Sequence, residues 1–194
     1  MSLRAVTPVG NGNHLRLTFE RDKIPVNAML FFTTAEQFPY KVGDVLDLAV
    51  TIDINEYNNK QSLSVIIKEI KPGGVDTNTV LKENQLFERL MNLEQLSPEQ
   101  VNTLLPTRED FAVVFKFLRS EKGWSYPPYI ICTRLNNKRI NYGRLQVILT
   151  AMHQLSLIEY KNTYNETGIK LLPTDGKADL NSAKIMKQLL SYIN

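Results

Sequence analysis

The chain has 194 residues, of which 43% are hydrophobic and 22% are charged, and its formal net charge is +3. These values are ordinary for a globular protein and exclude collagen-like, disordered and disulfide-scaffold classes. No apolar run approaches the ~18 residues that a membrane span requires, and the N-terminus lacks the apolar stretch of a secretory signal. The single cysteine, Cys132, cannot form an internal disulfide. We therefore expect a cytoplasmic protein that makes no membrane contact.

The residues that carry most enzymatic chemistry are few and scattered. The two histidines, His14 and His153, and Cys132 are not clustered at metal-ligand spacing. Cys132 and His153 could form a nucleophile–base pair, but a lone cysteine in an apolar run is more often a small core residue. The segment 175–178 lacks the glycine and hydroxyl of a phosphate-binding loop. We predict no catalytic residue, metal ligand or cofactor in this chain.

Charge is unevenly distributed along the sequence. Residues 1–72 carry eight basic and eight acidic side chains, whereas residues 73–106 carry two basic and five acidic ones. Residues 107–194 carry thirteen basic and seven acidic side chains, a net charge of +6. This asymmetry is typical either of a segment that meets a polyanion or of an ordinary solvated surface that happens to be basic.

Alternating apolar and polar residues predict five short strands in the first third of the chain. In the clearest one, Leu15, Leu17 and Phe19 share one face, and polar residues share the other. The expected strands cover residues 5–10, 14–20, 26–33, 46–54 and 63–70. Five short antiparallel strands favour a sandwich or a small closed barrel, and their spacing fits the five-stranded OB-fold β-barrel.

Ligands of such barrels lie across the second and third strands and the flanking loops. Binding of a single nucleic-acid strand needs cations along the phosphates and flat rings on which bases stack. The candidates on this surface are Arg16, Arg21, Lys23, Phe31, Tyr57 and Lys60. The alternative is that Phe31 packs beneath a neighbouring element and that Tyr57 only caps a hairpin turn.

Three segments occur in an order and at a spacing that are typical of one protein family: HLRLT from His14, INEY from Ile54 and SLSVIIKEI from Ser62. This series resembles the OB domain of RecJ, the bacterial single-stranded-DNA-specific exonuclease. By position, the resemblance assigns DNA contacts to His14, Arg16, Tyr57 and Lys60. Ser64 stands where the family usually has a glutamine, so no polar contact is carried over there.

RecJ enzymes are 5′-to-3′ exonucleases whose upstream DHH-type core binds manganese or magnesium through aspartates and histidines. No Asp-His-His sequence occurs in this chain. The resemblance therefore implies a C-terminal accessory part of such a nuclease, which serves DNA repair and recombination and is inactive alone. Some RecJ enzymes carry an extra region after the barrel, and residues 79–194 occupy that place.

Helical patterns dominate the rest of the sequence. We predict a helix over residues 79–94, helix starts at Ser97 and Thr107, a short helix after Pro128 and a helix capped by Asn141. Two strands at 157–161 and 168–172 and a final helix from about Ser182 follow. The order helix, short helix, turn, helix, hairpin is that of a winged helix-turn-helix.

The third helix and the wing of such a module face DNA. The exposed candidates there are Lys138, Arg139, Tyr142, Arg144 and Lys161, with Lys170 near the wing. The same topology also serves protein contacts and domain packing. We thus predict a two-domain α+β chain: an OB domain at 1–74, a helical linker at 75–106 and a winged-helix-like domain at 107–194.

Two hypotheses for function follow. In the first, the chain holds single-stranded DNA for a catalytic core that it lacks. In the second, it docks the nuclease to a single-strand-binding protein or another repair factor, and its basic surface meets an acidic peptide.

Overall fold

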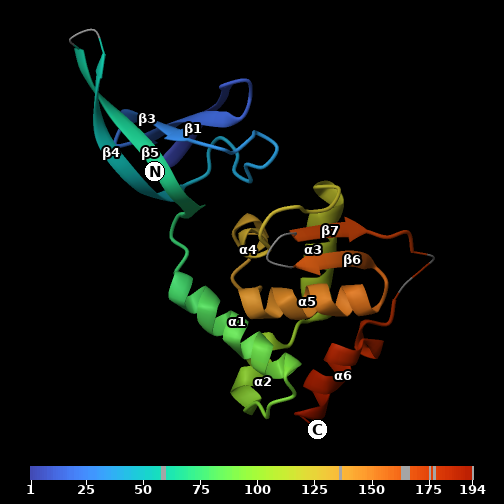
Figure 1. The fold of residues 1–194 in the computed structure, drawn as a ribbon. Coiled ribbons are helices and arrows are strands. Elements are labelled where there is room, and N and C mark those ends of the chain that lie inside the picture. Colours follow the sequence, from blue (N-terminus) through green and yellow to red (C-terminus); the bar gives the residue numbers. More distant parts are fainter. Residues whose placement is uncertain (58–59, 136, 163–166, 175, 177, 194) are drawn as a thin grey trace. The chain divides into compact units, whose positions relative to one another are not determined.

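The computed structural model describes residues 1–57, 60–135, 137–162, 167–174, 176 and 178–193. It divides into two compact units, Met1–Val75 and Asp76–Asn194 (Figure 1). The first is built on a five-stranded sheet and the second is mainly helical, so the α+β class is confirmed. The division differs from the predicted one, because residues 76–106 belong to the second unit and do not form a separate linker.

The first unit contains β1 (Ser2–Val9), β2 (His14–Arg21), β3 (Ile24–Leu30), β4 (Leu46–Tyr57) and β5 (Lys60–Pro72). Their order in the sheet is β1-β2-β3-β5-β4. Neighbouring pairs are antiparallel except β3 and β5, which meet in parallel at Met29 and Ile66. Residues of all five predicted strands lie in these five strands.

The inner face of this sheet forms the core of the first unit. Leu3, Leu15, Leu17 and Phe19 are fully buried, as the alternation in β2 predicts. Each such side chain contributes about 1.5–3 kcal/mol of hydrophobic stabilisation. The long connection between β3 and β4 adds the buried residues Phe38 and Tyr40, whose rings meet edge to face with 5.4 Å between ring centroids.

The barrel is only partly closed. Ser2 forms an isolated bridge with Val45, just before β4, and Leu3 N–H donates to the Asp44 carbonyl. Met1 and Leu46 also exchange two backbone hydrogen bonds, and Gly43 N–H donates to the Leu3 carbonyl. Among the described residues, the start of β1 therefore pairs with the short segment around Val45 that leads into β4. The pairing is limited to these residues, so the unit has the partly open, five-stranded architecture of an OB fold, and the predicted fold class is confirmed.

The second unit contains six α-helices, one short 3₁₀-helix and two strands among its described residues. They are α1 (Thr77–Met91), α2 (Pro98–Leu104), α3 (Arg108–Ser120), α4 (Tyr129–Leu135), α5 (Tyr142–Gln154), β6 (Ile158–Asn162), β7 (Thr167–Leu171), η1 (Leu180–Ser182) and α6 (Lys184–Ser191). The predicted caps are confirmed: Ser97 and Thr107 form capping boxes with Gln100 and Asp110, and Asn141 caps α5.

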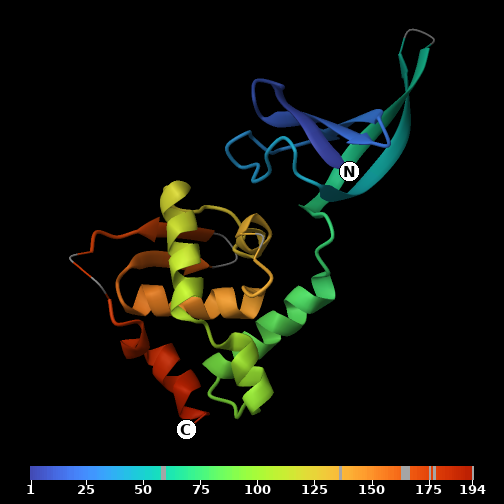
Figure 2. The same ribbon diagram turned by 180° about the vertical axis from the view of Figure 1, so that it is seen from behind.

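Helix α5 forms the centre of the second unit (Figures 1 and 2). Eight of its thirteen residues are buried, and α1, α2, α3, α4, α6 and β6 all contact it. Trp124 is 6% exposed, and its backbone pairs with that of Ile169 in β7. This bridge after α3 completes the order helix, strand, helix, helix, hairpin of a winged helix.

Candidate nucleic-acid interface

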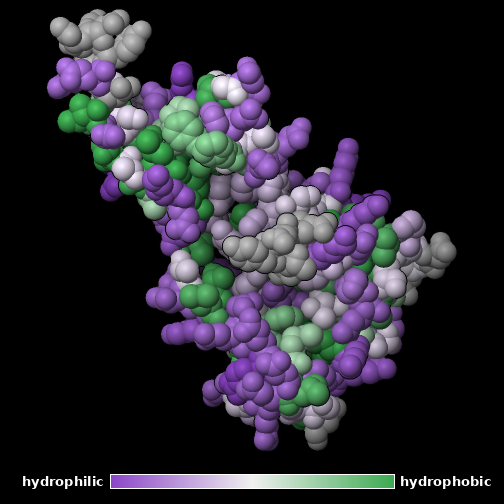
Figure 3. Space-filling model, in the orientation of Figure 1, coloured by the Kyte–Doolittle hydropathy of each residue, from purple (hydrophilic) through white to green (hydrophobic). Residues whose placement is uncertain are grey.

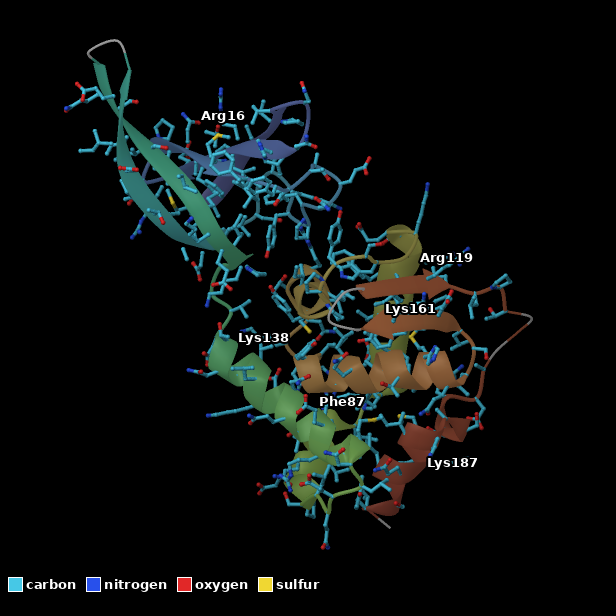
Figure 4. All side chains as sticks on the ribbon, in the orientation of Figure 1. Arg16, Phe87, Arg119, Lys138, Lys161 and Lys187 are labelled. Carbon is cyan, nitrogen blue, oxygen red and sulfur yellow. The ribbon has the colours of Figure 1, made fainter. Side chains whose placement is uncertain are left out.

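The outer face of β1, β2 and β3 carries the polar side chains that alternate with the buried ones. Arg16 lies in the middle strand, opposite Thr7 on β1 and Met29 on β3. Its side chain is exposed (Figure 4). It makes no hydrogen bond or ion pair with any residue that the structure describes. A guanidinium in this state can bind a phosphate without first breaking an internal contact.

An aromatic cluster lies next to Arg16, where β2 begins and β3 ends. The imidazole of His14 meets the rings of Phe31 and Phe32 edge to face, each at 5.2 Å between ring centroids. Phe31 is 40% exposed and Phe32 is 87% exposed. The structure thus brings together three of the predicted contacts, His14, Arg16 and Phe31, and adds Phe32.

Phe32 was missed because the strand pattern was extended through residues 26–33. The strand β3 in fact ends at Leu30, and the φ angle of Phe32 is 56°. A signal was present in the sequence: two adjacent phenylalanines in a strand point to opposite faces, so they cannot both enter one core.

The other candidates of the first unit lie away from this cluster. Arg21 ends β2 and Lys23 lies in the β2–β3 turn, at the opposite end of the hairpin and roughly 20 Å away by strand rise. Asp22 and Lys23 both have positive φ there, as a type I′ turn requires. Tyr57 and Lys60 pair at the end of the β4–β5 hairpin, and their side chains lie outside the described part of the structure.

Arg139 of the second unit is engaged by neighbouring side chains. Its Nη2 donates to Thr107 Oγ1 at 3.2 Å and lies 3.8 Å from the Asp110 carboxylate. Its Nη1 lies 3.4 Å from Glu109. The guanidinium therefore packs against the first turn of α3.

Arg144 of α5 is held more firmly. It donates to the Arg139 carbonyl at 2.7 Å and to the Asn102 carbonyl at 2.6 Å, and it lies 4.0 Å from the Asp110 carboxylate. Its side chain is only 15% exposed. Burial lowers the pKa of Arg144, and the nearby Asp110 opposes this effect. Its predicted role as an exposed phosphate contact does not match this environment.

The beginning of α5, where a recognition helix would read DNA, is covered by α1 and α2. Tyr142 N–H donates to the Glu83 carboxylate at 2.8 Å. A Cβ atom at Gly143 would lie 2.8 Å from both the Glu83 carbonyl oxygen and Leu104 Cδ2. Burial raises the pKa of Tyr142 to about 12. Tyr142 and Arg144 are thus used for packing within the unit. Arg139 is held by neighbouring side chains and stays exposed.

The remaining cations of the predicted winged-helix surface are exposed. Lys138 lies in the loop before α5, and Lys161 and Lys170 lie on the hairpin strands β6 and β7 (Figure 4). Residues 163–166, which join β6 to β7 in the sequence, lie outside the described residues.

The described residues include no group of three or more histidine, cysteine, aspartate or glutamate side chains placed to hold a metal ion. Within the same ranges, no helix has both the length and the hydropathy needed to cross a membrane. Burial, with a smaller contribution from Glu83, raises the pKa of the Cys132 thiol to about 12, and His153 is exposed with Nδ1 at 3.2 Å from the Ile158 carbonyl oxygen.

The sheet order, the partly open barrel and the exposed outer face define the first unit as an OB domain. Residues 1–69 match the family model of the RecJ OB domain. The resemblance inferred from the sequence is thereby confirmed for this unit, and it indicates a nucleic-acid-binding role. A comparison with curated proteins finds no match. The identity of the second unit as an extra RecJ region stays a prediction.

Proposed function

We propose that this chain is an accessory part of a RecJ-like exonuclease and that its OB unit holds single-stranded DNA for a catalytic core located elsewhere. On this proposal, the chain has no nuclease activity of its own and serves DNA repair and recombination. Manganese or magnesium would belong to the catalytic core and not to this chain.

The observation that carries the proposal is the position of Arg16. This cation is exposed on the outer face of β2, in a segment that matches the RecJ OB domain. Arg16 pairs with Met29, and Leu15 pairs with Leu30 in the next row of the sheet. The partly exposed ring of Phe31 directly follows Leu30 in the chain. Cations that follow phosphates, next to rings on which bases stack, are the arrangement by which OB folds bind a single strand.

The test is fluorescence anisotropy of a labelled oligothymidylate titrated with the intact chain. Binding through about three phosphates predicts an affinity that falls about 20-fold between about 50 and 200 mM salt. Arg16→Ala should lower the affinity and make the dependence on salt shallower. Lys187→Ala removes an exposed cation from α6 of the second unit and serves as the matched control (Figure 4).

Loss of affinity in Lys187→Ala equal to that in Arg16→Ala would mean nonspecific attraction to a basic protein. Absence of binding at the lower salt concentration would overturn the proposal. Degradation of the oligonucleotide by purified chain, with or without added manganese, would contradict an accessory role.

The second candidate function is docking of a protein partner, such as a single-strand-binding protein or another repair factor. It is favoured by one observation: Ile52, Ile54 and Leu63 on β4 and β5 are 63%, 63% and 73% exposed. They share a face of the paired strands, since Ile54 lies opposite Leu63, and Figure 3 shows hydrophobic side chains along this hairpin. Binding to such a surface is much less sensitive to salt than binding to phosphates.

A further inference from the structure

Phe32 combines two features that rarely occur together. It is 87% exposed, so burial of its ring adds little stability. Its φ angle is 56°, in the left-handed region that a bulky L-residue avoids. Strained residues persist where the surrounding structure holds them, and they concentrate at ligand sites.

The residue that holds Phe32 is His14. The backbone N–H of Phe32 donates to His14 Nδ1 at 3.0 Å. The acceptor of this hydrogen bond is the lone pair of Nδ1, so the contact ties the imidazole ring directly to the backbone of Phe32. The edge-to-face contacts of the same imidazole with Phe31 and Phe32 fix both rings relative to β2.

The turn between β1 and β2 supports the other side of the imidazole. Gly10 has a φ angle of 57°, and a Cβ atom there would lie 2.9 Å from His14 Cδ2. Only a glycine therefore lets the turn approach the ring this closely. The imidazole is enclosed by this turn and the two phenylalanines.

We propose that Phe32 is a base-stacking residue and that His14 is its positioning residue. The ligand is an unpaired nucleobase of a single strand, whose flat face covers the exposed ring of Phe32. Arg16 lies two residues along β2 from His14, roughly 7 Å by strand rise, within reach of the phosphate of a stacked nucleotide. This inference rests on the proposed function and specifies the site of base contact.

The test compares two strands of equal length, an oligothymidylate and a strand of abasic sites, which keeps the phosphates and lacks the bases. Phe32→Ala in the intact chain should weaken binding of the oligothymidylate about 5- to 100-fold and leave binding of the abasic strand unchanged. Phe32→Tyr should bind as the wild type does. Ile24→Ala is the matched control, because Ile24 is 64% exposed at the opposite end of the same hairpin.

The role of His14 is tested by rescue. His14→Ala removes the acceptor for the Phe32 N–H and should lower the ratio of oligothymidylate affinity to abasic affinity. His14→Asn retains an acceptor oxygen near the position of Nδ1 and should restore part of that ratio. A general loss of structure would lower both affinities together, so the ratio separates positioning from folding.

A spectroscopic measurement avoids dependence on loss of affinity. The indole introduced by Phe32→Trp should be quenched by the oligothymidylate and not by the abasic strand, whereas Trp124 is 6% exposed and contributes a constant background.

The outcomes are distinguishable. If the wild-type chain binds neither strand, both the proposed function and this inference are overturned. If it binds the oligothymidylate and Phe32→Ala binds it equally well, DNA binding stands and base stacking on Phe32 is overturned.

Discussion

Two arginines, each on an element predicted to contact DNA, have opposite environments. Arg16 of the first unit is exposed and unpaired among the described residues, whereas Arg144 of the second unit donates to two backbone carbonyls. The first unit has no net charge over residues 1–72, and residues 107–194 carry +6. The net charge of a segment therefore does not show which of these two arginines is more accessible.

The difference has a local cause. The carbonyls at the end of a helix lack partners within the helix, and they carry the negative end of its dipole. Asn102, near the end of α2, offers such a carbonyl to the five-donor guanidinium of Arg144. The middle of a strand such as β2 has its carbonyls in the sheet ladder, so Arg16 finds no acceptor in the backbone around it.

The largest effect that would test this comparison is expected from Arg144→Ala. Two charged hydrogen bonds are lost, and the buried carboxylate of Asp110 loses a neighbouring cation. We expect the free energy of unfolding of the second unit to fall by about 3 kcal/mol. Hydrogen exchange of the α5 amides in the intact chain measures this change.

The exposed Lys138→Ala is the matched control, with an expected change within about 0.5 kcal/mol. A loss of DNA affinity in Arg144→Ala without a loss of exchange protection would break the comparison, because it would show that Arg144 contacts DNA directly.

The next largest effect is expected where α1 and α2 pack on the beginning of α5. In Gly143→Ala, the added Cβ meets the Glu83 carbonyl oxygen and Leu104 at 2.8 Å. Such overpacking should cost about 1–3 kcal/mol, again measured by exchange of the α5 amides. Gly168→Ala adds a Cβ with nothing within 4 Å and should be close to neutral. Equal stability of the two variants would show that α1 and α2 do not pack tightly on α5.

Much of the fold could be predicted because its signals are local. The alternation of Leu15, Leu17 and Phe19 shows which face of β2 is buried, and the capping residues Ser97 and Thr107 mark helix starts. The packing of α1 on α5 could not be predicted, because it depends on the close approach of Gly143 to Glu83, 60 residues apart in sequence. Periodicity identifies an apolar face and does not identify its partner.

The candidate site was predicted in part for the same reason. Strand alternation places Arg16 and His14 on the outer face of β2, and the structure agrees. The left-handed backbone conformation of Phe32 could not be predicted, because the alternation of apolar and polar residues assumes regular strand geometry. The internal use of Arg139 and Arg144 depends on carbonyls and carboxylates from other elements, which composition cannot locate.

A smaller effect would sharpen the account of Phe32. Phe32→Ala and Phe32→Gly both remove the ring contacts with His14, but a Cβ at a φ angle of 56° is strained and glycine has none. We expect Phe32→Gly to be more stable than Phe32→Ala by about 1 kcal/mol, measured by exchange of the β2 and β3 amides. Equal stability would mean that the backbone relaxes in the alanine variant and that no strain is stored there.

The smallest effect at neutral pH concerns Cys132, which lies on α4. Burial raises the pKa of its thiol from 9.0 to about 12. Below pH 9 the thiol is protonated in both the folded and the unfolded chain, so it adds no pH dependence to stability there. Between pH 9 and 12 only the unfolded chain releases this proton, so the folded state loses stability as pH rises.

The same shift controls the reactivity of Cys132. Because the thiolate is the nucleophile, the native chain at pH 8 should react with iodoacetamide about 1000-fold more slowly than the chain unfolded in guanidinium. The native rate should then rise about tenfold per pH unit as long as the fold persists. Rapid alkylation of the native chain at pH 8 would show that α4 and its neighbours open readily. The side chains of the second unit would then be accessible, and their contrast with the exposed face of β2 would not hold.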